Sequence, residues 1–280
     1  MDITDSKHIL AGKKGIIFGI INENSLAWAV AKHCVAEGAN VVITNTKAAA
    51  KLGSPESLAA SINMPFIPCD ATQEDDLEHL LFESQKLLGG QIDFVLHAVA
   101  QSQNLRRHKP YENLCYSYFQ KTLDISALSF HKLLQTALKL DALSTNASVL
   151  TITYIASERS MHGYNDMADA KALLESIVRN FGRILGEKKQ IRINAISQSP
   201  VPTKAGSHWN EESYFLTYSD QLAPLGNATA DDLADLCVVM FSDYTKRVTM
   251  QTIYNDGGFS KTLLSPALIN SFRKLTDDDK

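Results

Sequence analysis

The sequence predicts a single-domain α/β fold over residues 1–280, in which helices flank a doubly wound parallel sheet of about seven strands. Two observations predict it. Short β-rich runs alternate along the chain with amphipathic segments, and the β-rich runs are continuously apolar rather than alternating apolar and polar. Such strands have both faces covered, as in a parallel sheet between two layers of helices. The 280 residues, 45% of them apolar, suffice for one sizeable core.

The expected elements follow one another in a regular order. Strands are expected at residues 13–20, 40–46, 65–71, 92–100, 147–155, 191–197 and 251–257. Helical segments are expected at residues 25–38, 56–62, 75–90, 111–140 and 165–187. Residues 199–215 form the one long irregular stretch, where Pro, Gly and polar residues alternate with aromatic ones. We expect a substrate-binding lid there, with a permanently docked surface loop as the alternative.

Charge and cysteine content exclude several classes of function. The net charge is −4 and the charged residues are scattered, so no basic field for nucleic acid is expected. The four cysteines are far apart, with no CxxC or histidine pair at zinc-ligand spacing, so no metal is expected. The chain has no apolar run near the ~20 residues that span a bilayer. We expect a cytoplasmic enzyme with no membrane or nucleic-acid partner.

The first expected strand leads into a turn suited to a dinucleotide pyrophosphate. "GIIFGIINENSLAWAVA" places Gly15 and Gly19 before the helix but lacks the third glycine of the GxGxxG fingerprint. Gly19 lets the backbone approach the phosphates, and Ser25 can offer a hydroxyl and an amide at the positively polarised helix N-terminus. Ser25 could equally be a plain N-cap. Its position after strand one of an open parallel sheet favours a cofactor, as in Rossmann-like folds.

The turns after the second and third strands bear on which cofactor binds. The second offers no Asp or Glu that would bind a ribose 2′-hydroxyl. Asn45 or Thr46 could hydrogen-bond the ribose, whereas Lys47 could meet a 2′-phosphate or lie in solvent. We expect NAD, with NADH preferred over NADPH. Asp70 could accept a hydrogen bond from the adenine amino group, or cap the next helix, which Thr72 could also do.

The stretch "TYIASERSMHGYNDMADAKALLES", residues 153–176, carries the candidate chemistry. Tyr164 and Lys171 are seven residues apart, so in a helix they share nearly one face, about 10 Å apart along the axis. The lysine leans toward the helix N-terminus and can approach both a ribose hydroxyl and the tyrosine oxygen. Its charge would lower the pKa of Tyr164. Tyr154, ending the preceding strand, would face the same crevice.

These motifs resemble a known family. "YNDMADAKA", "ISQSPVPTKAG", "DFVLHAVA" and "YNDGGFS" are similar to segments of the enoyl-acyl-carrier-protein reductases of bacterial fatty-acid synthesis, the FabI type. These enzymes are a branch of the short-chain dehydrogenase/reductase superfamily whose hallmark is Tyr-x6-Lys with an additional upstream tyrosine. The resemblance extends from about Gly12 to Ser260, and "NEN", "SQSP" and "PLGNAT" resemble the Bacteroidetes-type enzymes.

The resemblance implies a reaction: NADH reduces a trans-2-enoyl thioester on acyl carrier protein, the last step of type II fatty-acid elongation. Tyr164 would stabilise the enolate by hydrogen bonding, Tyr154 would be an additional proton donor, and Lys171 would fix the cofactor ribose. Ser102 and Tyr164 are the expected substrate contacts. The expected cofactor-binding residues are Gly19, Ser25, Leu26, Asn45, Asp70, Ala71, Val99, Lys171, Val201 and Thr203. Core packing is the alternative for Leu26 and Val99. A homotetramer in the bacterial cytoplasm is also implied.

The residues argue against two other functions. A short-chain dehydrogenase acting on a hydroxyl or ketone usually has a lysine four residues after its tyrosine, and neither tyrosine here has one. A non-catalytic dinucleotide sensor would not need the Tyr164 and Lys171 pair. The run "RRHK", residues 106–109, could steer an acidic carrier protein or be a solvated loop.

Three positions depart from the family's pattern. Ala100 stands where glycine is common and could narrow the nicotinamide pocket, and Gln101 is polar where the family tends to be apolar. Ser199 likewise replaces a common glycine before Pro200. These changes leave the expected fold intact and bear on chain-length preference and inhibitor response.

Overall fold

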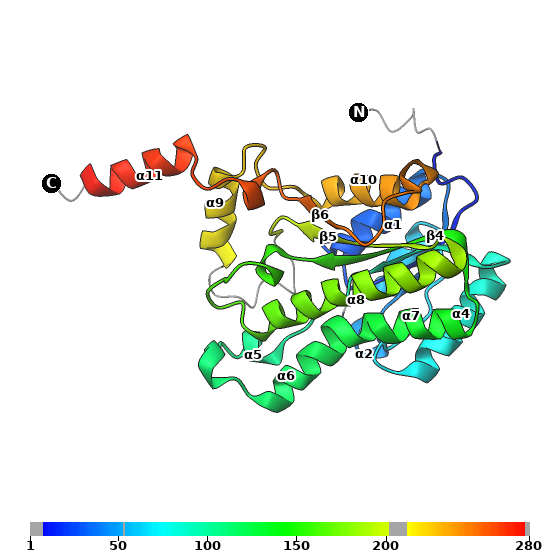
Figure 1. Cartoon of the computed structure of the whole chain (residues 1–280). Coiled ribbons are helices and arrows are strands. Elements are labelled where there is room, and N and C mark those ends of the chain that lie inside the picture. The colour runs from blue at the N-terminus through cyan, green and yellow to red at the C-terminus, as the bar shows by residue number, and fades with distance from the viewer. Residues whose placement is uncertain (1–7, 53, 202–211, 278–280) are drawn as a thin grey trace.

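The computed structural model describes residues 8–52, 54–201 and 212–277, and places a parallel sheet between two layers of helices (Figure 1). Within these residues the sheet has six strands in the order β2-β1-β3-β4-β5-β6, and every neighbouring pair is parallel. The strands are β1 (Lys14–Phe18), β2 (Asn40–Thr44), β3 (Ile92–His97), β4 (Leu143–Thr153), β5 (Arg192–Gln198) and β6 (Thr252–Asn255). The predicted doubly wound α/β sheet is confirmed.

Helices cover both faces of the sheet, as the continuously apolar strands require. The α-helices are α1 (Leu26–Ala36), α2 (Lys47–Leu52), α3 (Pro55–Ser61), α4 (Glu74–Leu88), α5 (Gln103–Arg106), α6 (Tyr116–Leu123), α7 (Ser129–Lys139), α8 (Asp166–Lys189), α9 (Glu212–Leu222), α10 (Ala230–Phe241) and α11 (Pro266–Asp277). In Figure 1, α1 and α10 lie on one side of the sheet and α4, α7 and α8 on the other. Ile17 packs in the core cluster of the first layer, and its neighbours Ile16 and Phe18 pack in that of the second.

Residues 65–71, which were expected to form a strand, do not form a regular one, so the described sheet has six strands where about seven were expected. This segment follows the outer edge of β2, and Phe66 forms an isolated parallel bridge with Ile43. The Ile67 amide donates to the Ile43 carbonyl at 3.0 Å and the Cys69 amide to the Asn45 carbonyl at 2.9 Å. Because Pro65 and Pro68 lack an N–H and fix the backbone, the segment borders the sheet without becoming a regular strand.

The expected helical segment at residues 111–140 is interrupted. A 3₁₀ turn (Tyr111–Asn113) precedes α6, and a turn of π-helix, Asp124–Leu128, separates α6 from α7. The hydroxyl of Ser126 in the π turn accepts from the Gln101 amide at 3.0 Å and lies 3.2 Å from the Gln101 carbonyl. A π turn inside a helix often marks a functional site. Here it fixes the chain just after β3.

The packing of Gly15 against Phe94 gives a test of the core. An ideal Cβ at Gly15 would lie 2.2 Å from the Phe94 ring, which stacks on Phe241 with centroids 4.4 Å apart. Gly15→Ala should therefore lower the free energy of unfolding by about 1–3 kcal/mol, measured by denaturant titration. Gly186→Ala is the control, because its Cβ would meet its nearest atom at 3.7 Å.

The same contact predicts non-additivity. In a Phe94→Leu background, which lacks the ring, Gly15→Ala should cost less than it does in the wild-type protein. Equal costs in the two backgrounds would show that the Phe94 ring does not limit the size of residue 15.

Candidate active site

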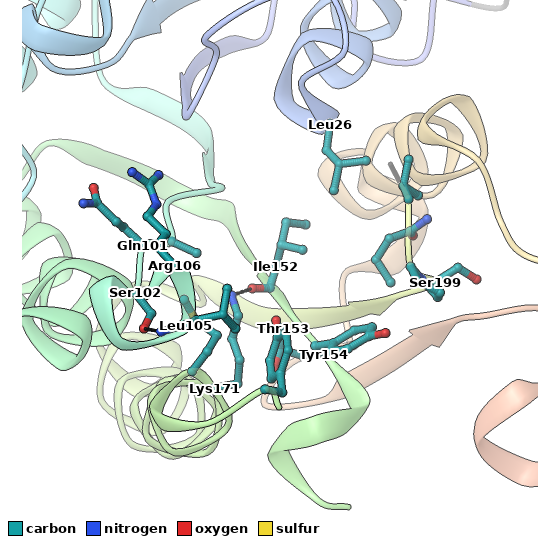
Figure 2. Close-up of a pocket in the computed structure, with 16 residues that line it drawn as sticks. Leu26, Gln101, Ser102, Leu105, Arg106, Ile152, Thr153, Tyr154, Lys171 and Ser199 are labelled. Atoms are coloured by element: carbon teal, nitrogen blue, oxygen red, sulfur yellow. Dashed lines mark hydrogen bonds between the residues drawn. The ribbon is translucent and has the colours of Figure 1, made fainter. Parts of the chain in front are cut away.

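A pocket lies at the carboxyl ends of the strands, beside the point where the strand order reverses between β1 and β3. Open α/β sheets bind ligands at such a switch point. Figure 2 shows the lining side chains converging from several elements. They are Leu26 of α1, residues 100–102 and 105–106 after β3, Ile152–Tyr154, Tyr164, Met167 and Lys171, and residues 198–201 after β5. The pocket thus joins segments far apart in the sequence.

Lys171 enters the pocket from α8, whereas Tyr164 lies before the first residue of that helix, so the two residues do not share one helical face as the spacing predicts. Figure 2 shows the Lys171 side chain directed at the Ile152 carbonyl, to which Nζ donates at 2.7 Å. The side chain is buried, and burial lowers the pKa of Lys171 to about 8, while the nearby Glu175 carboxylate opposes that shift. Glu175 is itself buried and accepts from the Thr153 hydroxyl at 2.6 Å.

The two tyrosines lie together at the pocket, with ring centroids 5.2 Å apart. Tyr154 also meets Phe215 of α9 edge to face at 6.4 Å. Burial raises the pKa of Tyr164 well above its ordinary value. The expectation that Lys171 lowers this pKa is therefore wrong for this structure, because the pocket desolvates the phenol and the ammonium is directed at the Ile152 carbonyl. Tyr164 is held as a neutral phenol that can donate a hydrogen bond.

The turn after β1 has the features expected of a phosphate-binding turn. Gly19 has φ +104°, and a Cβ there would lie 2.1 Å from the Ala98 carbonyl oxygen, so another residue would not fit. The Ser25 hydroxyl accepts from the Ile21 and Asn22 amides at 3.0 and 3.1 Å. Ser25 thus occupies the N-cap position of α1 without a side-chain cap bond, and its hydroxyl shapes the turn instead.

This geometry fits a dinucleotide. With no side-chain cap on its first turn, the N-terminus of α1 can present amide donors and a positive dipole end to a phosphate. Leu26, at the same helix end, lines the pocket. The alternative of core packing also holds in part for Leu26, since it packs at the edge of the core cluster beneath α1.

Side chains at the ends of β2 and of the neighbouring segment make local contacts. Asn45 Nδ2 donates to the Ile20 carbonyl at 2.9 Å and its Oδ1 accepts from the Thr46 amide at 2.8 Å, which ties β2 to the phosphate turn. Asp70 Oδ1 accepts from the amide and hydroxyl of Thr72 at 3.0 and 2.7 Å. The N-cap of α4 is Gln73, so neither Asp70 nor Thr72 caps that helix.

Of the remaining expected cofactor-binding residues, some lie in the core, one lines the pocket and one lies outside the described residues. Ala71 is buried in the core cluster and Val99 packs against it. Val201 lines the pocket. Thr203 lies outside the described residues, so its assignment stays a prediction. The structure brings together Leu26, Ser102, Tyr154, Tyr164, Lys171 and Val201 in the pocket lining, whereas Gly19, Ser25, Asn45, Asp70, Ala71 and Val99 are not among the lining residues.

Ser102 lines the pocket, but its hydroxyl is used within the protein. Ser102 Oγ donates to Asp166 Oδ1 at 2.6 Å and accepts from the Leu105 amide at 3.0 Å, capping α5. The assignment of Ser102 as a substrate contact stays a prediction. Sequence reasoning also missed Asp166 and Glu175, although both lie in the quoted stretch, two residues after Tyr164 and four after Lys171.

The expected lid at residues 199–215 is only partly described. Residues 202–211 lie outside the described residues, and the lid itself stays a prediction. At its C-terminal end the expected segment overlaps helix α9, which begins at Glu212 and carries Tyr214 and Phe215. The Ser199 hydroxyl accepts from the Ala228 amide at 2.9 Å, so the residue that replaces a common glycine bonds the loop before α10.

The described residues contain neither a membrane-spanning helix nor a metal-binding cluster of side chains. No helix among them is both long enough and apolar enough to cross a membrane. Nor do they contain a group of three or more His, Cys, Asp or Glu side chains that could hold a metal ion.

Comparison with known proteins gives consistent matches. A family model described as Enoyl-(Acyl carrier protein) reductase matches residues 19–260. Enoyl-[acyl-carrier-protein] reductase [NADH] 2 of Rhizobium meliloti is 33% identical over 257 residues, 91% of this chain and 94% of that protein. The corresponding FabI of Rickettsia typhi is 34% identical over 255 residues, 90% of this chain and 95% of that protein.

Solved structures agree with the sequence relatives. The crystal structure of a FabI–NADH complex from Alistipes finegoldii has a TM-score of 0.92 and 48% identity, covering 93% of this chain and 92% of that one. A second FabI structure from the same organism has a TM-score of 0.90 and 45% identity, covering 96% and 98% of the two chains.

The buried Lys171 predicts a pH dependence of stability. Folding lowers its pKa from 10.5 to about 8, so between these pH values the unfolded chain binds the extra proton. Stability relative to a Lys171→Met variant should therefore rise with pH across this window, by up to about 1.4 kcal/mol per pH unit. Denaturant titrations between these pH values measure the difference. Lys188→Met removes an exposed lysine of the same helix and should show no such trend, whereas a flat Lys171→Met difference would contradict the burial effect.

Proposed function

We propose that the pocket carries out the reaction of the enoyl-(acyl carrier protein) reductase family, to which the chain belongs. The chain is an NADH-dependent oxidoreductase of fatty-acid synthesis that reduces the double bond of a trans-2-enoyl thioester on acyl carrier protein. The observation that carries the proposal is the pairing of neutral Tyr164 with buried Lys171 in one pocket at the sheet's switch point.

Several residues would hold the cofactor. The turn at Gly19 and the uncapped N-terminus of α1 suit the pyrophosphate, and Leu26 and Val201 suit the nicotinamide end because both line the pocket. Lys171 would bind a ribose hydroxyl by turning its ammonium from the Ile152 carbonyl. When bound, NADH supplies the hydride that adds to the β-carbon of the enoyl group.

Tyr164 would stabilise the charge that hydride addition creates. Electron density moves onto the thioester oxygen as an enolate, and a neutral phenol can donate a hydrogen bond to it. The raised pKa of Tyr164 suits this role, because the phenol remains protonated at neutral pH. The apolar pocket strengthens that bond by excluding water. A proton then adds to the α-carbon to complete the saturated chain.

Tyr154 has a supporting role in this proposal. Its ring is 5.2 Å from that of Tyr164, so it reaches the same end of the pocket from β4. We assign it as the additional proton donor. We also infer a homotetramer in the bacterial cytoplasm, supported by exposed apolar side chains such as Tyr116 and Leu128, which a partner subunit could cover.

An activity assay tests the reaction. Purified protein should oxidise NADH when given crotonyl-CoA, a simple trans-2-enoyl thioester, and should show no comparable turnover with simple alcohols. NADPH run beside NADH tests the cofactor preference, since the turn after β2 carries no acidic side chain in residues 45–51. Activity on alcohols with none on enoyl thioesters would refute the proposed reaction.

Two substitutions separate the roles of Tyr164 and Lys171. Tyr164→Phe should lower kcat about 100-fold or more while leaving the Kd for NADH within about threefold, because it removes only a transition-state donor. Lys171→Met should raise the Kd for NADH about tenfold. NADH fluorescence and steady-state kinetics give both quantities. Tyr244→Phe and Lys188→Met alter exposed side chains and serve as controls. Equal loss of NADH affinity in both pocket variants would contradict the assignment.

A further inference from the structure

A fully buried carboxylate lies behind the pocket, outside the residues that the proposed chemistry uses. Asp166 is the first residue of α8 and has no exposed surface. Its Oδ1 accepts from Ser102 Oγ at 2.6 Å. Its Oδ2 accepts from Asn104 Nδ2 at 2.8 Å and from Thr122 Oγ1 at 2.9 Å. A buried carboxylate is costly unless donors compensate it, and here three side chains do so.

The three donors come from different parts of the chain. Ser102 and Asn104 belong to the segment after β3, while Thr122 belongs to α6. Asn104 extends the network, because its Oδ1 accepts from the Cys115 amide at 3.0 Å and its Nδ2 lies 3.2 Å from the Cys115 carbonyl. All three donors are buried. The carboxylate therefore ties the start of α8 to both the segment after β3 and α6.

This network joins two walls of the pocket. One wall is residues 100–106, which includes Ser102 and Leu105, and Figure 2 shows these two side by side. The other wall is formed by Tyr164, which precedes α8, and by Met167 in the first turn of α8, and both residues line the pocket close to Asp166 in sequence. The contact between Asp166 and Ser102 directly links the two walls.

Apart from its bonds to Asp166, the first wall is held by the contacts of Asn104 with the Cys115 backbone and by the bonds at Gln101. Its backbone is clamped at Gln101 by Ser126 of the π turn, and α5, which follows, is only four residues long. Helices that short have little stability of their own. The bonds of Ser102 and Asn104 to Asp166 connect this wall directly to the first turn of α8, so they help to set where Leu105 lies relative to Met167.

We propose that Asp166 is a positioning residue that fixes the separation of these two walls, and so sets the affinity of the pocket for long acyl chains. The inference rests on the proposed function, because it assumes that an enoyl thioester lies between the walls. A short enoyl group reaches Tyr164 without filling the space between Leu105 and Met167, whereas a long one depends on it. Loosening the link should therefore harm long substrates more than short ones.

Ser102 and Thr122 provide a matched pair for testing this role. Ser102→Ala and Thr122→Val each remove one hydroxyl donor from the same carboxylate, but only Ser102 belongs to the pocket wall. An effect of stability alone would appear in both variants. An effect of wall position should appear with Ser102→Ala and with Asp166→Asn. Asp169→Asn, three residues along the same helix, is a further control because Asp169 bonds Tyr111 at the surface.

The experiment compares crotonyl-CoA with trans-2-dodecenoyl-CoA in steady-state kinetics and measures NADH binding separately. In Asp166→Asn and Ser102→Ala, KM for the long thioester should rise about tenfold, and KM for crotonyl-CoA should change less than about threefold. In Asp166→Asn, the kcat with crotonyl-CoA and the Kd for NADH should stay near their wild-type values. Thr122→Val and Asp169→Asn should retain the wild-type ratio of the two KM values.

Several outcomes would overturn the inference. One is a rise in KM that is equal for both thioesters, and another is the same chain-length effect in Thr122→Val. If Asp166→Asn does not fold, the Ser102→Ala and Thr122→Val pair decides the matter alone. A wild-type enzyme that reduces neither thioester would refute the proposed function, and this inference with it. Wild-type activity with an unchanged KM ratio in Ser102→Ala would refute the inference only.

Discussion

Parallel pairing of β1, β3, β4 and β5 is the constraint on which the site depends. Their register places Phe18 beside His97, His97 beside Thr151 and Thr151 beside Ala195, so the four strands end near one edge. Because parallel strands run in the same direction, the chain must cross back to the amino end of the sheet before each new strand. The segment that follows each strand therefore starts at the carboxyl end of the sheet. The pocket is lined by those segments and by the last residues of β4 and β5, with α8 as the crossover helix after β4. The segments that follow β1 and β3 approach each other closely, because a Cβ at Gly19 would collide with the Ala98 carbonyl oxygen.

Burial has opposite effects on the two ionisable groups at this edge, and both effects favour the neutral form. The pKa of Tyr164 is raised and that of Lys171 is lowered, because the apolar pocket penalises charge of either sign. Lys171 keeps a partner in the Ile152 carbonyl, and Glu175 offsets part of the penalty. A dinucleotide brings negative phosphates and ribose hydroxyls to this region. Binding would therefore favour the ammonium while leaving Tyr164 as the proton-bearing donor that an enolate needs.

The sequence was sufficient for the fold and for the central pair, and the reasons are physical. Continuous apolar strands are a local pattern, so the parallel sheet could be predicted. Tyr164 and Lys171 both line the pocket, although Tyr164 lies before α8 and not on the helical face that the spacing implied. The misses depend on tertiary contacts. Pro65 and Pro68 keep residues 65–71 from forming a regular strand beside β2. The desolvation that raises the pKa of Tyr164, where a decrease was expected, arises only when the folded chain forms the pocket. No local sequence pattern reveals that the Ser102 hydroxyl donates a hydrogen bond to Asp166, 64 residues away in sequence.

These polar contacts also explain how the segment after β3 tolerates its departures from the family pattern. Ala100 has less backbone freedom than the glycine common there, and Gln101 adds a polar side chain to the lining. The segment's position is set by two hydrogen bonds, in which the Gln101 amide donates to the Ser126 hydroxyl and the Ser102 hydroxyl donates to the Asp166 carboxylate. Because those donors and acceptors are buried, shifting the segment would leave them unsatisfied at a cost of about 1–3 kcal/mol each. Changes at residues 100 and 101 therefore alter the shape and polarity of the pocket surface while the wall beneath them stays in place.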